Sequence, residues 1–261
     1  MRTKPFKQRV KTWAIVIIIV GIYVWAFAGL PEIALKESAS NAITGILQGF
    51  VYPDWDYVYD PGGEDLLRAL LETLAIAILG TFISAVLCIP FAFMAARNMS
   101  KHRIISSTTK VILSAIRVFP ELIMALFFIK AVGLGPFAGI LALGFHSIGM
   151  LGKLISEAIE DMDFSPTEAL IASGANRMQV IWFAIVPQVL PAFLSYTLYR
   201  LEISVRSATT LGIVGAGGVG APLIFALHGH SWDRVGIILI GIIVMVTMID
   251  LISGVIRRRI V

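Results

Sequence analysis

The sequence contains few charged residues and almost no cysteine. Charged residues make up 15% of the 261 positions and hydrophobic residues 57%, whereas ordinary soluble domains are roughly 25% charged. So few charges could not cover the surface of a soluble chain of this length, which excludes a soluble fold. The single cysteine, Cys88, excludes an internal disulfide. With a mean hydropathy of +0.87, the composition predicts an integral membrane protein.

Motifs for catalysis and nucleotide binding are also lacking. The pattern G-x-x-x-x-G-K-[ST] does not occur, so any ATP and Mg²⁺ must bind to a partner. No Ser-His-Asp or Cys-His arrangement appears, and His228 and His230 have no further ligands at metal spacing. The net charge of +4 is explained by basic residues at the two ends and is not a nucleic-acid signal. We therefore expect no enzyme activity, metal, cofactor or nucleic-acid partner for this chain.

Six apolar segments are long enough to cross a bilayer, which takes about 20 helical residues each. The first is followed by Leu30-Pro31-Glu32, a poor cleavage site, so we interpret it as a transmembrane helix and not a signal peptide. We predict an all-α membrane protein, with a basic segment at 1–11 and a single six-helix domain at 12–261. The expected spans are 12–30, 67–96, 109–131, 137–157, 181–204 and 235–256.

The distribution of charge predicts the orientation. Basic residues flank apolar spans on the cytoplasmic side, and they gather at 1–11, 97–108 and 257–261, with Arg177 in the loop 158–180. The loop 31–66 is instead acidic and is assigned to the outside; it includes an amphipathic stretch around 38–50 and interfacial aromatic residues. Both termini are therefore expected in the cytoplasm.

The loop 158–180 contains strong helix-end signals. Ser165 is expected to cap a helix that has Pro166 in its first turn, with Glu168 completing a capping box. Gly174 suits the end of that helix, because glycine accepts the left-handed conformation. Asn176 is expected to cap a second helix that runs to Pro187. A short rigid helix on the cytoplasmic side can dock into a soluble partner and transmit its motion.

This loop resembles the EAA loop of ABC-importer permeases, in which the corresponding helix couples to the ATPase. The resemblance rests on Glu168-Ala169, then Gly174 and Pro187, although Leu170 replaces a second alanine of the pattern. It implies coupling roles for Ser165, Glu168, Ala169, Gly174 and Pro187.

Two further stretches, 117–161 and 204–220, resemble the phosphonate-transport permease (PhnE) family. That resemblance implies a type I importer architecture in the bacterial inner membrane: a homodimer of six-helix subunits, two ATP-binding subunits and an extracytoplasmic solute-binding protein.

The glycine-rich stretch 210–223 has the spacing of a dinucleotide-binding loop, Gly215-x-Gly217-x-x-Gly220, with Asp233 eighteen residues after the first glycine. Such a loop needs a preceding strand and a βαβ unit, and here apolar spans stand on both sides. Two interpretations remain open. The glycines, with Gly218, either permit close helix packing or line the outer part of a pathway and act as a hinge.

Ionisable residues inside spans are costly and need a reason. Arg117 and Glu121 are four residues apart around Pro120, as are Glu202 and Arg206, so each pair is expected to share a helix face and neutralise itself. In a homodimer two copies of Arg117 would also suit an oxyanion. Our pathway candidates are Arg117, Glu121, His146, Glu202, Arg206, Gly215, Gly217, Gly218 and Gly220, with His146 the most readily explained as an interhelical hydrogen-bond partner.

Together these observations predict the permease subunit of an ATP-driven importer for phosphonate or a related phosphorus oxyanion, coupled to its ATPase through residues 165–174. The alternatives are a permease for another small solute, of the methionine type, and a membrane-bound enzyme with a nucleotide cofactor.

Overall fold

The computed structural model describes residues 6–28, 37–62, 65–100 and 102–260, and every regular element among them is a helix. The basic residues at positions 1–5, the start of the expected outer loop at 31–36, positions 63 and 64, and Lys101 lie outside the described residues. The chain divides into two compact units, one ending at Thr44 and the other beginning at Gly45.

The first unit contains α1 (Phe6–Ala28), and its 18-residue stretch Lys11–Ala28 is apolar enough to cross a membrane. None of that stretch is buried by protein. Side chains such as Trp25, which is 79% exposed, therefore suit contact with lipid. The helix agrees with the first predicted span.

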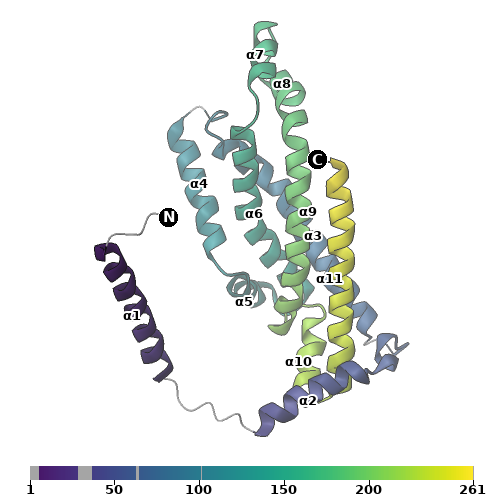
Figure 1. Cartoon of the computed structure of the whole chain (residues 1–261). Helices are drawn as coiled ribbons and strands as arrows, with labels where there is room; N and C mark the ends of the chain where they lie inside the picture. Colours follow the sequence, from purple (N-terminus) through teal and green to yellow (C-terminus); the bar gives the residue numbers. More distant parts are fainter. Residues whose placement is uncertain (1–5, 29–36, 63–64, 101, 261) are drawn as a thin grey trace. The chain divides into compact units, whose positions relative to one another are not determined.

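The larger unit is a bundle whose long helices are apolar enough to span a membrane (Figure 1). Three of them match predicted spans to within a few residues: α3 (Leu66–Ala95), α6 (Pro136–Glu160) and α11 (Trp232–Ile260). The fourth is a continuous helix made of α8 (Arg177–Val180), a π-helical turn (Ile181–Ile185) and α9 (Val186–Ile213).

The expectation that the helix after Asn176 stops at Pro187 is wrong. Proline removes one N–H and crowds the carbonyl four residues earlier. Here the wider π turn precedes it, in which the N–H of Val186 donates to the carbonyl of Ile181. The helix therefore continues to Ile213.

The third predicted span, 109–131, is also corrected. It is two helices, α4 (Arg103–Val118) and α5 (Glu121–Val132), bent by 87° relative to each other. Phe119 is extended, with ψ of 125°, because proline disfavours helical conformation in the residue before it. Pro120, at the cap position of α5, is extended as well, with ψ of 140°. The structure thus has five candidate spans among the described residues, or six if the bent pair is counted as one.

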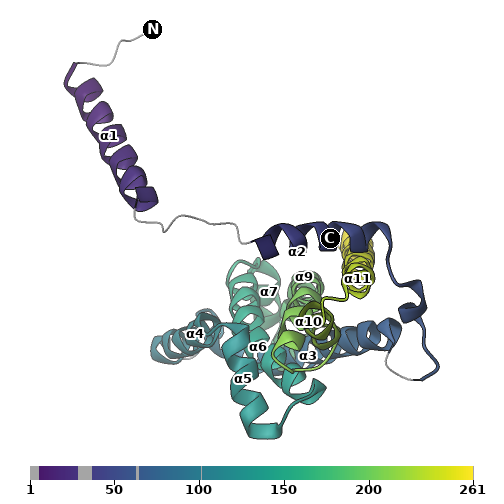
Figure 2. The same ribbon diagram turned by 90° about the horizontal axis from the view of Figure 1, so that it is seen from below.

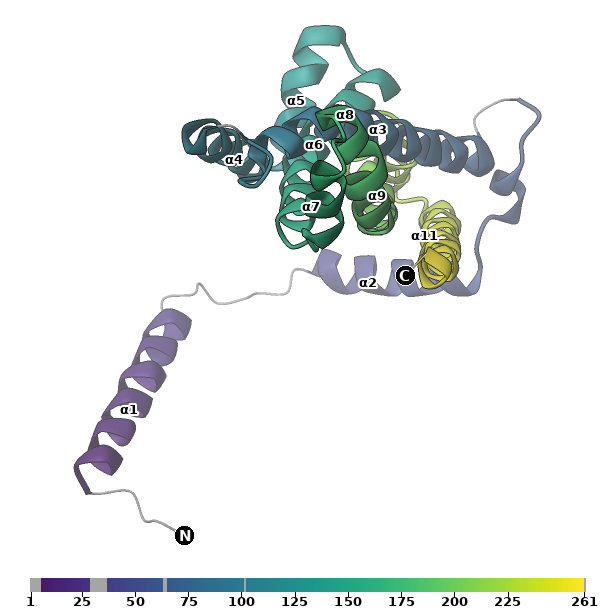
Figure 3. The same cartoon turned by 90° about the horizontal axis from the view of Figure 1, so that it is seen from above.

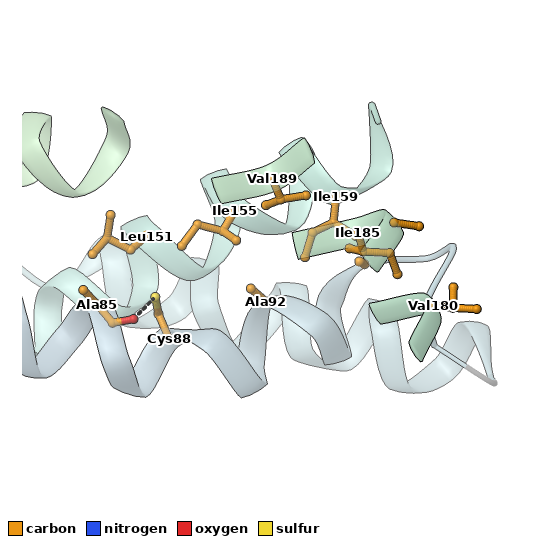
Figure 4. Packing of buried hydrophobic residues seen from close by; sticks show 11 residues of the cluster. Ala85, Cys88, Ala92, Leu151, Ile155, Ile159, Val180, Ile185 and Val189 are labelled. Carbon is orange, nitrogen blue, oxygen red and sulfur yellow. Dashed lines mark hydrogen bonds between the residues drawn. The ribbon is translucent and has the colours of Figure 1, made fainter. Parts of the chain in front are cut away.

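Small residues let the helices approach closely. A Cβ added to Gly80 on α3 would lie 3.0 Å from the Leu143 side chain on α6, and one added to Gly149 on α6 would lie 2.8 Å from the Leu113 carbonyl on α4. Next to these contacts, α3, α6 and the π turn with the start of α9 share an apolar core (Figure 4). Its buried members include Ala85, Cys88, Ala92, Leu151, Ile155, Ile159, Val180, Ile185 and Val189.

The shorter elements lie at the two ends of this bundle. The helix α7 (Ser165–Ala172) extends beyond the ends of the long helices in Figure 1, and Figure 3 shows it from above, next to α8. The helices α5 and α10 (Gly220–His228) lie toward the opposite end, seen from below in Figure 2.

The expected amphipathic helix in the acidic outer loop is present as α2 (Glu37–Val51), followed by a 3-10 turn at Trp55–Val58. A Cβ added to Gly236 would lie 2.0 Å from the Gly49 carbonyl. The end of α2 therefore packs directly on the first turns of α11.

Candidate functional site

The first turn of α7 is held by an acidic residue just before the helix. Asp163 accepts hydrogen bonds from the Ser165 backbone N–H at 3.0 Å and from its hydroxyl at 2.8 Å. These two bonds, the backbone one foremost, hold the pKa of the Asp163 carboxyl below its usual value. The predicted capping box is wrong: Ser165 is the first helical residue, and the cap position is Phe164, with no side-chain cap.

The predicted end of this helix is confirmed. Gly174 has a φ of +83°, and the N–H of Ala175 donates to the Leu170 carbonyl at 3.0 Å, which closes the helix in the Schellman pattern. Asn176 then caps α8, because its side chain accepts from the Gln179 N–H at 2.9 Å while the Gln179 side chain accepts from the Asn176 N–H at 2.8 Å. Both ends of the projecting segment are thus defined by local hydrogen bonds.

The segment presents exposed apolar side chains. Ile171 is 58% exposed and Met178 is 62% exposed, and Glu168 and Ala169 are also exposed. Leu170, on the other side of α7, packs against the core shared by α3, α6 and the start of α9. The helix is therefore fixed to the bundle on one side and open on the other, as a docking element requires.

A second cluster of functional interest lies inside the bundle, around Arg200 on α9. This side chain is only 2% exposed. Its Nη2 donates to the Glu121 carboxylate of α5 at 2.5 Å, and its Nε donates to the Ser147 hydroxyl of α6 at 2.7 Å. His146 Nδ1 lies 3.0 Å from the same Glu121 oxygen. Three helices are tied together by these contacts.

The expected pairing of Arg117 with Glu121 is therefore wrong. Pro120 turns the chain sharply between them, so the two residues do not share a helix face. Arg117 is exposed and forms no ion pair with any residue that the structure describes. The interpretation of His146 as an interhelical partner agrees with the structure. Arg200 was missed, although an ionisable residue inside the predicted span 181–204 was a signal that it needed a partner.

The pairing of Glu202 with Arg206 is wrong as well. Glu202, 7% exposed, accepts a hydrogen bond from Arg257 of α11 at 2.5 Å, while Arg206 reaches Asp250 of α11 at 3.2 Å. Both partners come from α11, so two ion pairs between α9 and α11 form in place of the predicted pair within α9.

The glycine-rich stretch is a loop between α9 and α10 with left-handed residues at Gly215, Gly217 and Gly218. It is held against α3, since Gly218 N–H donates to the Glu72 carboxylate at 3.0 Å and Val219 N–H to the Thr73 hydroxyl at 2.8 Å.

The glycines in and around this loop also permit close packing. A Cβ on Gly220 would meet the Thr209 carbonyl at 2.3 Å, and one on Gly217 would meet the backbone of Pro136 at 2.8 Å. A helix precedes the loop in place of the strand that a dinucleotide site requires. Close packing, one of the two interpretations left open by the sequence, is therefore realised here.

A hollow of about 470 Å³ opens beside this loop at the end of the bundle where α10 lies. Its lining comes from two stretches that are far apart in the sequence. It includes the polar residues Tyr57, Asp65, Arg68, Glu72, Ser231 and Arg234, together with Gly217 and Gly218. Arg234 lies over the Tyr57 ring, 5.3 Å from its centroid, and its Nε is 3.3 Å from the Asp54 carboxylate. Apart from Gly217 and Gly218, sequence reasoning did not single out these residues as a site.

Known proteins share both the sequence and the fold. Residues 88–261 match the family described as "Binding-protein-dependent transport system inner membrane component". The chain is 40% identical over 246 residues to the phosphite transport system permease protein PtxC of Stutzerimonas stutzeri, covering 94% of this chain and 87% of that one. It is 37% identical over 262 residues to the phosphate-import permease protein PhnE of Mycolicibacterium smegmatis, covering 100% of this chain and 48% of that one.

Among solved structures, a chain of the inward-facing MetNI methionine ABC transporter superimposes with a TM-score of 0.67 at 23% identity, over 75% of this chain and 96% of that one. This is a likeness of fold.

The apolar helical bundle and the capped helix projecting from it define a multi-pass membrane transport component. The chain belongs to the family of binding-protein-dependent inner-membrane transport components, the permeases of ABC transporters. The predicted family is confirmed, and the chain is a translocation component and not itself a catalyst. Membership also implies ATPase and binding-protein partners.

Proposed function

We propose that this protein is the permease subunit of an ATP-driven importer for a phosphorus oxyanion: phosphite, phosphonate or phosphate. The names of its relatives support this substrate class, because PtxC is a phosphite permease and PhnE of M. smegmatis a phosphate-import permease. In this proposal two copies form a homodimer with six spans each, and each copy contacts one ATP-binding subunit.

The exposed apolar side of α7 is the observation that carries the coupling role. Ile171 and Ala169 lie on a helix whose ends are fixed by hydrogen bonds and which extends past the apolar spans (Figure 1). Exposed apolar side chains outside the bilayer favour a protein partner. The ATPase binds here, and its movement on ATP binding is delivered to the bundle through α7.

The proposed orientation is supported by the charges at the two ends of the larger unit. Arg177, next to α7, and Arg257, at the end of α11, lie toward one end, whereas Asp54 and Asp56 lie by the start of α11 at the other. This asymmetry supports a cytoplasmic position for α7 and for the C-terminal end of α11. For the N-terminus the support is the sequence alone, because the basic residues at 1–11 precede the first apolar span.

The outer hollow and the bend between α4 and α5 are our candidates for the substrate pathway. Arg117 lies in the last turn of α4 beside that bend and is exposed, so in a homodimer two guanidinium groups would raise the positive potential along the path of an oxyanion. The glycine loop, with Gly217 and Gly218, lines the outer hollow and is placed to contribute to its gating. The remaining candidates, Glu121, His146, Glu202 and Arg206, hold helices together through interhelical contacts.

The test compares two substitutions at one exposed position of α7. Ile171→Asp places a charge on the apolar side and is expected to abolish co-purification of the ATPase and uptake of labelled phosphite, phosphonate and phosphate. Ile171→Val keeps the apolar contact and should behave as wild type. Membrane insertion, read from yield and monodispersity in detergent, should be equal in both. ATPase co-purification with Ile171→Asp at the wild-type level would refute the coupling role.

A further inference from the structure

The segment that joins α3 to α4 is hydrogen-bonded to α6 and to α8, the helices that precede and follow α7 in the chain. On the α6 side, Asn98 Nδ2 donates to the Ile159 carbonyl at 2.6 Å. On the α8 side, Arg177 Nη2 donates to the Met99 carbonyl at 3.1 Å. These bonds attach residues 96–100, which we call the α3–α4 connector, to the two helices that flank α7.

Glu160 makes the strongest of these attachments. It is the last residue of α6, five residues before α7 begins. Its carboxylate accepts two hydrogen bonds from Lys110 Nζ of α4, at 2.7 and 2.8 Å, and one from the Arg97 backbone N–H of the connector, at 2.7 Å. Hydrogen bonds in which one partner is ionised are about twice as strong as neutral ones. One side chain thus joins the end of α6 to two other elements.

A second glutamate of α6, Glu157, forms a different kind of ion pair from that of Glu160. Glu157, three residues earlier, lies 3.9 Å from Lys153 of its own helix, and its side chain is 49% exposed, against 24% for Glu160. A pair inside one helix stabilises that helix and transmits nothing to a neighbour. Of these two pairs, the Glu160 pair is the one that crosses from α6, which leads into α7, to α4, which leads to the bend at Pro120.

We propose that Glu160 is a positioning residue that transmits the movement of α7 to α4, through Lys110 and through the α3–α4 connector. The inference rests on the proposed function, because it takes α7 as the contact with the ATPase. The end of α6 and the start of α8 move with α7, and the connector moves with both. Lys110 then carries the displacement along α4 to the bend, beyond which α5 is tied to the Arg200 cluster.

The test uses the complete transporter, reconstituted in liposomes with its ATPase and binding protein. Glu160→Gln keeps the shape and a hydrogen-bond acceptor but removes the charge, and Glu157→Gln is the matched control on the same helix. We expect Glu160→Gln to retain ATPase co-purification and basal ATP hydrolysis while stimulation of hydrolysis by the loaded binding protein falls about 5-fold or more. Glu157→Gln should remain at the wild-type level.

Charge exchange separates transmission from simple stability. Glu160→Lys alone should lose stimulation, and adding Lys110→Glu should recover part of it, because the ion pair is re-formed with its polarity reversed. If Glu160→Gln does not assemble, Lys110→Met removes the same pair from the α4 side and should show the same loss of stimulation with retained basal hydrolysis.

Equal stimulation in Glu160→Gln and Glu157→Gln would overturn the proposal, and so would a double variant no better than Glu160→Lys. Failure of the proposed function looks different: the wild-type permease would then not co-purify with the ATPase at all. The main readout is ATP hydrolysis stimulated by the loaded binding protein. If none of phosphite, phosphonate and phosphate stimulates the wild-type transporter, the proposed substrate class is wrong, and Glu160 is tested in the same way with the ligand that does stimulate it.

Discussion

Removing the guanidinium of Arg200 should be far more damaging than removing any exposed charge of the same helix. Arg200→Met fills a similar volume but leaves the Glu121 carboxylate without its partner at 2.5 Å and the Ser147 hydroxyl without its donor at 2.7 Å. Truncating one member of a buried ion pair costs about 3–5 kcal/mol. The Glu121 side chain is 19% exposed and keeps His146 at 3.0 Å, so we expect the lower end, about 3 kcal/mol.

For a unit of this size each kcal/mol shifts the melting temperature by about 2–4 °C, so the expected fall is about 6–12 °C. The assay is thermal unfolding of the purified permease in detergent, followed by loss of the monodisperse peak. Arg206→Met is the matched control on the same helix. Its pair with Asp250 is 3.2 Å long and has side chains 55% and 42% exposed, so its loss leaves no charge buried inside the protein and should lower the melting temperature less than Arg200→Met.

A second variant tests whether the cost comes from the unpaired charge. Adding Glu121→Gln to Arg200→Met removes both charges, and replacing both members of a buried pair is often near neutral. The double variant should therefore melt above the single one. Equal melting temperatures for Arg200→Met and Arg206→Met would refute the reasoning, because the buried pair would then be worth no more than an exposed one.

Two further predictions concern the glycine loop and the start of α7. Gly218→Ala should lower the melting temperature more than Gly133→Ala. Both residues have positive φ, but of the two only Gly218 would place the new Cβ in a clash, 2.6 Å from the Thr73 hydroxyl. Equal melting temperatures would show that the loop can shift to accommodate the added Cβ, against this prediction. Asp163→Asn should speed hydrogen exchange at the start of α7, because it weakens the acceptor for Ser165. Since the pKa of Asp163 is lowered in the fold, its contribution is complete above the unfolded pKa and is lost only as pH falls through the folded one. Exchange corrected for intrinsic rate should therefore be flat from about pH 5 to 8, and a decline in protection in that window would contradict the assignment.

Features decided by a few neighbouring residues were predictable from sequence. Gly174 ends α7 and Asn176 caps α8 as expected, because each acts through the backbone of residues up to five positions away. Apolar length alone placed α3, α6 and α11 within a few residues. One local feature was not predicted. The Asp163 carboxylate accepts hydrogen bonds from the N–H and the hydroxyl of Ser165, so the Ser165 side chain does not cap the helix.

Which charges meet across the bundle was decided only by tertiary structure. The sequence placed Arg117, Glu121, Glu202 and Arg206 in or beside spans and paired them by helical spacing, yet Glu121 binds Arg200, 79 residues away, and Glu202 binds a residue 55 positions away. Helical spacing identifies neighbours on one helix and contains no information on which helix packs beside it. Sequence alone determined that this chain spans a membrane and presents a capped helix at one end. The packing of the helices decided which ionic contacts hold the bundle together, because a buried charge pairs with whatever group the neighbouring helix brings within reach.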